Sequence, residues 1–194
     1  MSTVPPQVAV AGPAVPRRAT ARFMLSHPAH AIALGLGSGL APVAPGTVGT
    51  LWAWLAFLVM DRWLDATGWG LAIGLGLALG IWACTVTARN LAIEDPSCIV
   101  WDEVIGFWIV LWLVTPAGFG LQLLAFVLFR IFDAVKRGPV GWADARFKRR
   151  RGQPIGWGQG FGILFDDLVA ALCTLLVLAV LMNLGLIGGE GLLP

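Results

Sequence analysis

The chain has 194 residues, of which 58% are hydrophobic and 12% charged, and its mean hydropathy is +0.81. Soluble domains carry about a quarter charged residues, so this composition excludes an ordinary soluble domain and indicates an integral membrane protein. Ten Trp and 25 Gly suit membrane helices, whose ends carry aromatic residues and whose contacts need small ones. The net charge of +2 includes no basic stripe interleaved with aromatic residues, which argues against a nucleic-acid partner. The cysteines are widely spaced, so neither a disulfide framework nor a zinc site is predicted.

The N-terminal part of the chain precedes the first apolar span. Residues 1–26 are expected to form a disordered cytoplasmic leader, because prolines interrupt them and no apolar stretch ends in a cleavage site. Residues 27–190 are expected to form a single membrane-embedded domain. Within it, residues 30–46 are apolar but short and rich in Gly and Pro, which predicts a short buried helix followed by an irregular or re-entrant loop.

Five apolar segments follow, and they predict an all-α integral membrane bundle. The predicted spans cover about residues 47–60, 68–88, 101–114, 119–133 and 162–187. Several are shorter than the roughly 20 residues that cross a bilayer, so flanking polar residues must enter the bilayer edge or the membrane must thin locally. The predicted fold therefore has about five transmembrane helices plus a short re-entrant or interfacial N-terminal helix.

The charges orient this bundle. With the N-terminus inside and five crossings, every Lys and Arg except Arg62 falls on the inner side, as the positive-inside rule expects. The same topology places the Gly/Pro-rich loop at 35–50 and a set of acids on the cytoplasmic face. These acids are Asp95, Asp102, Glu103, Asp133, Asp166 and Asp167.

Acids at the ends of three different spans indicate a cation site. Asp102 and Glu103 open an otherwise apolar run, Asp133 ends the fourth span, and the pair Asp166 and Asp167 begins the fifth. Like charges in one patch of low dielectric repel unless a divalent cation is present, and an all-oxygen ligand set favours Mg²⁺. Alternatively, each acid is a solvated helix-end residue. That reading explains a single acid but explains their joint placement poorly.

Two further stretches offer groups for a phosphate. In the loop at 35–50, Gly46 allows close approach of the backbone, and Ser38, Thr47 and Thr50 offer hydroxyl groups. A helix that begins near Thr47 would point free amides at an anion. The alternative for this loop is a helix-packing surface of small residues.

Arg130 and Lys136 lie near the end of the fourth span, on either side of Asp133. An Arg beside an Asp could hold a phosphate through two hydrogen bonds, and Lys136 could neutralise it as a point charge. The alternative is that both basic residues extend to an anionic leaflet.

Four sequence blocks occur in order along residues 35–170: GSGLAPVAPGTVGT, DPSCIVWDEVIG, FRIFDAVK and GILFDDLVA. With these blocks the chain resembles the bacterial phosphatidylglycerophosphatase A family. The resemblance implies a small helical enzyme that uses Mg²⁺ to remove the terminal phosphate of phosphatidylglycerophosphate, giving phosphatidylglycerol in phospholipid biosynthesis. It also implies a protein of the bacterial inner membrane, and the predicted spans and charges above make this a multi-pass protein with its active site on the cytoplasmic side.

The motif match and the reasoning above together define the predicted site. The predicted catalytic residues, which are also predicted metal ligands, are Asp102, Glu103, Asp133, Asp166 and Asp167. The motif match adds Asp95 as a further metal ligand. The predicted phosphate-binding residues are Ser38, Gly46, Thr47, Thr50, Arg130 and Lys136.

Two positions depart from the family pattern. Lys136-Arg137-Gly138-Pro139 replaces the usual Lys-Pro-x-Pro, so the turn after the fourth span is expected to differ. Thr50 replaces the usual Ser, which keeps the hydroxyl group. Neither change affects the acids.

A transporter or ion pathway that uses the acidic cluster is the second hypothesis. Transporters place ionisable groups near the bilayer midplane and often contain paired repeats. Here the acids gather at one face and no repeat is visible, which favours the phosphatase. The sequence leaves open the number of metal ions and the oligomeric state. It also leaves open whether water attacks directly or a phospho-aspartyl intermediate forms.

Overall fold

The computed structural model describes residues 18–136, 138–147 and 155–187, and within these ranges every regular element is a helix. This confirms the all-α prediction. The elements are α1 (Ala21–Leu25), α2 (Pro28–Ala33), the 3₁₀ helix η1 (Gly35–Leu40), α3 (Pro45–Met60), α4 (Ala66–Leu91), α5 (Trp101–Val114), α6 (Phe119–Val135), α7 (Pro139–Phe147) and α8 (Trp157–Asn183).

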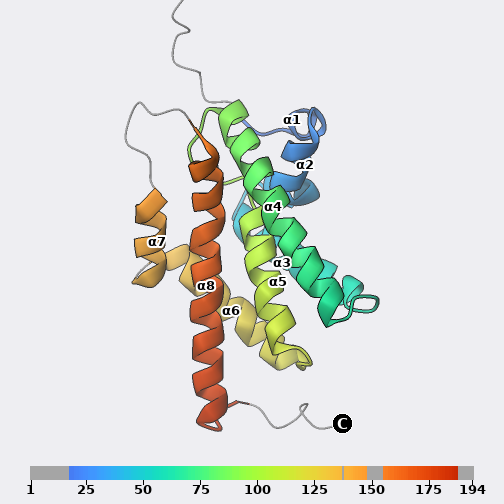
Figure 1. Ribbon diagram of the computed structural model, residues 1–194, viewed down its shortest axis with the longest axis vertical. Helices are drawn as coiled ribbons and strands as arrows, with labels where there is room; N and C mark the ends of the chain where they lie inside the picture. Colours follow the sequence, from blue (N-terminus) through green and yellow to red (C-terminus); the bar gives the residue numbers. More distant parts are fainter. Residues whose placement is uncertain (1–17, 137, 148–154, 188–194) are drawn as a thin grey trace, which may run out of the picture.

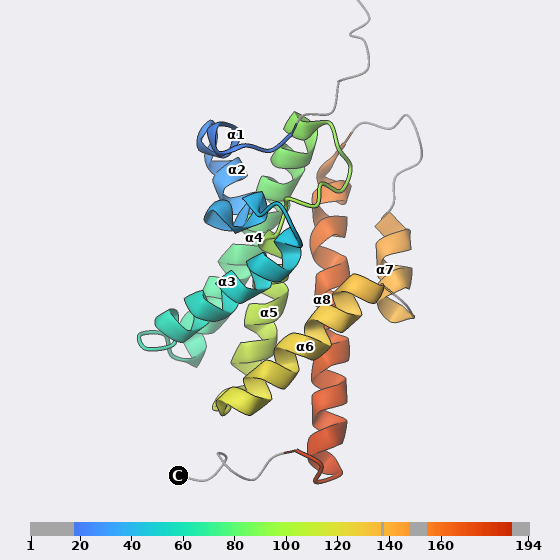
Figure 2. The same cartoon turned by 180° about the vertical axis from the view of Figure 1, so that it is seen from behind.

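Helix α5 lies at the centre of the bundle, where it packs against α3, α4, α6 and α8. It is buried because it is apolar on nearly all sides: the run from Val104 to Trp108 is buried without interruption. Helix α8 is the longest element and also packs against α4, α6 and α7 (Figure 1). Seen from behind, α3 and α6 cross the face of the bundle opposite α4 (Figure 2).

An aromatic cluster holds the helices around α5 together. Phe57 of α3 stacks on Trp69 of α4 with ring centroids 4.3 Å apart, and Trp108 of α5 meets Trp69 edge-on at 5.7 Å. The indole N–H of Trp108 donates to the Ala53 carbonyl at 2.9 Å, and that of Trp101 donates to the Gly76 carbonyl at 2.9 Å. Each buried indole therefore has the polar partner that it requires.

Two helices are long and apolar enough to cross a membrane: α4, with a mean hydropathy of 1.9, and α8, with 2.4. Helix α3 is apolar but shorter. Helices α5 and α6, which the sequence also predicted as spans, have 14 and 17 residues. The described part of the chain thus shows two candidate membrane-spanning helices rather than clearly five, and it supports association with a membrane.

The helix boundaries differ from the sequence prediction in several places. The predicted N-terminal helix and loop at 30–46 is divided between α2 and η1, with a kink at Leu36 (φ 54°) and Gly37 (φ 112°). Helix α7 forms between the fourth and fifth predicted spans, where the sequence analysis predicts no helix. Helix α1 lies in the stretch assigned to the leader, of which residues 1–17 fall outside the described residues.

Helices α4 and α8 approach closely because glycine stands at their contact. A Cβ atom on Gly160 of α8 would overlap the Thr85 hydroxyl and the Ile81 carbonyl of α4. A Cβ atom on Gly80 of α4 would likewise overlap Trp101 of α5 and Leu164 of α8. Small residues at such contacts let helix backbones pack together in a membrane.

We predict that Gly160→Ala destabilises the protein by about 1–3 kcal/mol, because the added methyl must displace the backbone of α4. Gly158→Ala is the matched control, since Gly158 lies in the first turn of the same helix with nothing within 4 Å of the added atom. Ala is the better helix former, so the control should be neutral or slightly stabilising. Thermal unfolding in detergent measures both, and equal melting temperatures would contradict this account of the α4–α8 contact.

Candidate active site

The polar residues of the site come from four helices, α3, α5, α6 and α8. The first turn of α5 supplies Asp102 and Glu103, and the last turns of α6 supply Arg130 and Asp133. Figure 2 shows the beginning of α3 and the end of α6 beside α8, at a level between the two ends of α8. The pair Asp166 and Asp167 accordingly lies within α8, where Asp166 is about 14 Å along the helix axis from Trp157.

Small residues fix the start of α5 in this position. The Val100 N–H donates to the Ala33 carbonyl of α2 at 2.9 Å, which ties the chain before α5 to the N-terminal helices. A side chain on Gly39 would overlap the Cys98 carbonyl, and one on Gly49 would press on Val100. Gly39 and Gly49, both in the first sequence block GSGLAPVAPGTVGT, therefore determine the position of the acids of α5.

Asp102, Glu103 and Asp167 form a carboxylate cluster. One oxygen from each lies within 4.8 Å of the others. Glu103 and Asp167 are buried, with exposed fractions of 8% and 2%, and Asp102 is partly buried. Within the described part of the chain, one oxygen of each side chain is buried without a hydrogen-bond partner: Asp102 Oδ1, Glu103 Oε2 and Asp167 Oδ2.

This cluster fits a hard divalent cation. Buried carboxylates this close repel one another, and buried polar atoms without partners are rare in folded proteins. A cation between them removes both costs, because it neutralises the charge and uses the unpartnered oxygens as ligands. An all-oxygen donor set suits Mg²⁺ or Ca²⁺ rather than a soft metal.

Arg130 lies directly beside the carboxylate cluster. Its Nη1 atom is 2.5 Å from Asp133 Oδ2, 3.7 Å from Glu103 Oε1 and 3.4 Å from Thr50 Oγ1. Its Nε atom is buried and has no hydrogen-bond partner among the residues that the structure describes. Arg130 thus retains donor capacity at the edge of the cluster.

The first turns of α3 close the site on the side of Arg130. Thr50 donates its hydroxyl hydrogen to the Gly46 carbonyl at 2.9 Å. Gly46 lies against both charged groups, because a Cβ atom there would overlap Glu103 Oε1 and would lie 3.1 Å from Arg130 Nη2. The site therefore requires glycine at position 46.

Lys136 and Asp166 form an ion pair next to the cluster, with 2.5 Å between Nζ and Oδ2. Lys136 is the C-cap of α6, where its φ of 43° turns the chain away from the helix. Burial by itself would lower the pKa of Lys136, but the Asp166 carboxylate, with Asp95 and Asp167, raises it above the ordinary value. Lys136 is therefore charged at neutral pH.

The structure divides the predicted site residues into a main group, an adjoining ion pair, and three residues outside both (Asp95, Ser38 and Thr47). Asp102, Glu103, Asp133, Asp167, Arg130, Gly46 and Thr50 lie together. The pair Lys136 and Asp166 adjoins them, and the exposed Asp95 interacts electrostatically with both members of that pair.

The side chains of Ser38 and Thr47 form no hydrogen bond with the carboxylate cluster in the described part of the chain. The Ser38 hydroxyl donates to the Gly35 carbonyl within η1 at 2.9 Å. Thr47 is partly buried in the first turn of α3, and within the described residues no hydrogen bond joins either side chain to the acids.

Sequence reasoning missed the residues that hold the loop carrying Asp95. The Arg89 Nε donates to the Ile155 carbonyl at 2.5 Å, and the Gln159 side chain donates to the Glu94 carbonyl at 2.8 Å. These two bonds join the end of α4 to the beginning of α8. Arg89 carried a signal, because a basic residue in the last turn of a helix often binds nearby carbonyl groups.

Comparison with known proteins agrees with this arrangement. The sequence model of the phosphatidylglycerophosphatase A family matches residues 31–182. The phosphatidylglycerophosphatase A of Escherichia coli K12 is 35% identical over 156 residues, which cover 80% of this chain and 84% of that protein. The phosphatidylglycerophosphatase A of Haemophilus influenzae is 33% identical over 156 residues, covering 80% and 90%. No solved structure gives a significant match.

The family match spans every helix that contributes to the site, from the end of α2 to the last turn of α8. The two relatives match over most of their own length as well as most of this chain. The chain therefore belongs to the phosphatidylglycerophosphatase A family.

Proposed function

We propose that this protein removes the terminal phosphate of phosphatidylglycerophosphate and releases phosphatidylglycerol and inorganic phosphate. The observation that carries this proposal is the carboxylate cluster with Arg130 at its edge, in a chain of this family. Oxygen ligands beside a guanidinium group form a site for a metal-bound phosphate monoester. Family membership also argues against a transporter, whose ionisable groups would form a pathway rather than a closed cluster.

In this proposal Asp102, Glu103 and Asp167 hold Mg²⁺. When bound, the cation would neutralise phosphate oxygens and the charge that develops as the P–O bond breaks. Its three carboxylates are the ones with unpartnered oxygens. Asp102 has the most solvent access of the three, which suits it to contact the attacking water or the phosphorus itself.

The remaining predicted acids have a different part in the proposed mechanism. Asp133 contacts Arg130, and Asp166 contacts Lys136, so each acid orients a basic residue. Arg130 would bind the phosphate through its fork of N–H groups, and Lys136 would add a point charge. Thr50 supports Arg130 from α3. Ser38, Thr47 and Asp95 make none of these contacts within the described residues, so the proposal assigns them no role in the chemistry.

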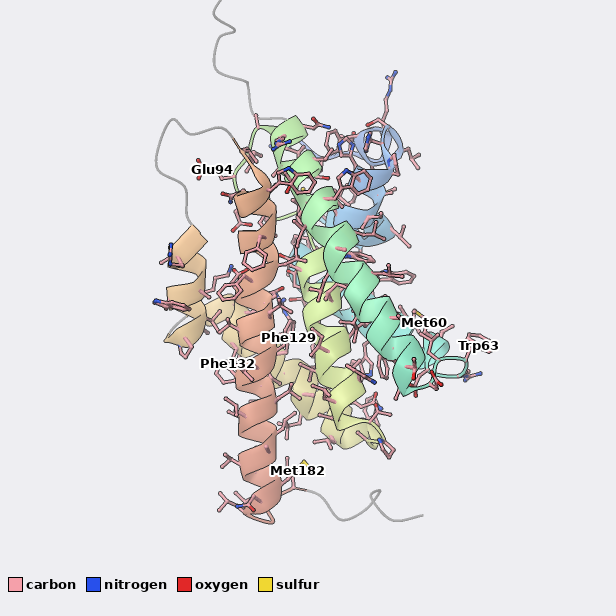
Figure 3. The ribbon with its side chains drawn as sticks, in the orientation of Figure 1. Met60, Trp63, Glu94, Phe129, Phe132 and Met182 are labelled. Carbon is pink, nitrogen blue, oxygen red and sulfur yellow. The ribbon has the colours of Figure 1, made fainter. Side chains whose placement is uncertain are left out.

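We also propose that α3, α4, α5, α6 and α8 each cross the inner membrane, with the site on the cytoplasmic side. The directions of the helices support this topology, because α3 and α5 begin at the site and α6 ends there. Figure 3 labels Glu94 near the beginning of α8, and labels Met60 and Trp63 at the far end of α3. In this topology the basic residues of the described part of the chain, all except Arg62, fall on the side of Glu94, as the positive-inside rule expects.

Asp167→Asn should lower kcat/KM for phosphatidylglycerophosphate by more than about 100-fold, because it removes a proposed metal ligand. Asp65→Asn is the matched control: Asp65 is exposed, caps α4 by accepting from the Gly68 N–H, and Asn caps equally well. Phosphate release from the lipid in detergent with Mg²⁺ measures both variants. Retained activity in Asp167→Asn would remove this residue from the site.

Mg²⁺ should raise the melting temperature of the wild-type protein but not that of Asp167→Asn. Binding to the folded state alone contributes about 2.7 kcal/mol when the ligand is at 100 times its Kd. Without metal, Asp167→Asn should unfold at no lower temperature than wild type, since it relieves repulsion between crowded carboxylates. EDTA should abolish phosphate release and added Mg²⁺ should restore it. Activity that survives EDTA would exclude the proposed metal dependence.

Arg130→Lys should lower kcat/KM by one to two powers of ten, or about 1.4–2.7 kcal/mol, because Lys keeps the charge but loses the planar fork. Arg62→Lys provides the control, as an exposed residue at the opposite end of α3. Steady-state kinetics on the lipid substrate measure the two variants side by side. If both behave alike, Arg130 does not bind phosphate.

A further inference from the structure

A groove of about 420 Å³ runs between η1 and the outer face of α3. Leu36 and Ser38 line it from η1, while Val48, Leu51 and Leu55 line it from α3. The volume lies in the range of small-molecule sites. Apart from Ser38 these side chains are apolar, and among the described residues no charged side chain lines the groove.

The groove and the candidate active site lie on opposite sides of α3. Gly46 and Thr50 face Arg130 and Glu103, one turn apart on the inner side of α3. Val48 and Leu51, which alternate with them in sequence, face the groove. A helix with its side chains is about 10–12 Å across, so this is the thickness of the wall between groove and site.

The direction of the groove follows α3 away from the site. From Val48 to Leu55 it extends about 10 Å along the helix axis, toward the end where Figure 3 labels Met60. Its polar residue, Ser38, belongs to the 3₁₀ helix that precedes α3, while the lining farther along α3 is apolar. A ligand in the groove would therefore have its polar end beside η1, level with the first turns of α3, and an apolar body pointing away along that helix.

Leu36 gives the groove a shaped edge. It is a leucine in the left-handed region, with φ 54° and ψ 26°, and 64% of it is exposed. Such a conformation is unfavourable for a bulky residue, and here it holds an apolar side chain out beside the groove. Helix geometry alone would not produce this placement.

We propose that this groove binds one acyl chain of the lipid substrate while the terminal phosphate lies at Arg130 and the carboxylate cluster. The proposal rests on the proposed function, whose substrate joins a phosphate and two acyl chains in one molecule. The groove begins beside Val48 in the first turns of α3, level with Gly46 on the site side of the same helix, so the phosphoglycerol head group would span the width of that helix. Because the groove begins beside the same turns of α3 that contact the site from the opposite face, the substrate's own chain is favoured over a protein partner.

The test compares two substrates that carry the same terminal phosphate. One is phosphatidylglycerophosphate with two long acyl chains, and the other is its fully deacylated form, glycerophosphoglycerophosphate. Leu51→Trp fills the groove and should raise KM about tenfold for the lipid, with kcat and the deacylated substrate unchanged. Leu79→Trp is the matched control, because Leu79 of α4 is 46% exposed and Leu51 is 48% exposed.

The possible results separate the two levels of the proposal. If wild type hydrolyses neither substrate, the proposed function fails. If Leu51→Trp and Leu79→Trp behave alike, or Leu51→Trp slows both substrates equally, the groove does not bind the acyl chain. Thermal unfolding verifies that Leu51→Trp is folded. Should it not fold, Leu55→Trp fills the same groove one turn farther along α3 and is held to the same outcomes.

Discussion

Carboxylates from Asp102, Glu103 and Asp167 lie closer together, and more deeply buried, than negative charges can lie without compensation. Arg130 and Lys136 compensate part of this charge, but within the described residues an oxygen on each member of the cluster has no hydrogen-bond partner. The rest of the structure follows from this constraint. In the proposed function, the point where α5 and α8 meet, beside α3 and α6, is the place for a cation and for the phosphate that it would bind.

The unequal lengths of the helices reflect that requirement. Helices α4 and α8 have 26 and 27 residues, whereas α3, α5 and α6 have 14 to 17. The shorter helices begin or end at the site, so their terminal turns supply Gly46, Glu103 and Asp133 rather than more apolar length. Helix α8 passes the site and contributes its acids from within, where glycine at its contact with α4 lets the two long helices pack closely.

The six acids form a set in the sequence but divide into different partnerships in the structure. Three have unpartnered oxygens that suit a metal, two are paired with basic residues, and Asp95 is exposed on a loop. The residues of the first sequence block, GSGLAPVAPGTVGT, also have different surroundings in the structure. Gly46 and Thr50 face the charged site, whereas Ser38 faces the apolar groove on the other side of α3.

The sequence by itself determined the helical class, the family and the set of acids, because apolar periodicity and contiguous motifs are local properties of a chain. Its roles for individual residues and its five spans remain predictions. Only the tertiary structure decided that Asp167 joins Asp102 and Glu103 while Asp166 turns to Lys136, since adjacent residues on a helix point about 100° apart and their partners lie far away in sequence. It also decided that Ser38 lies apart from Thr50, because the kink at Leu36 and the start of α3 fix which face of that helix each residue approaches.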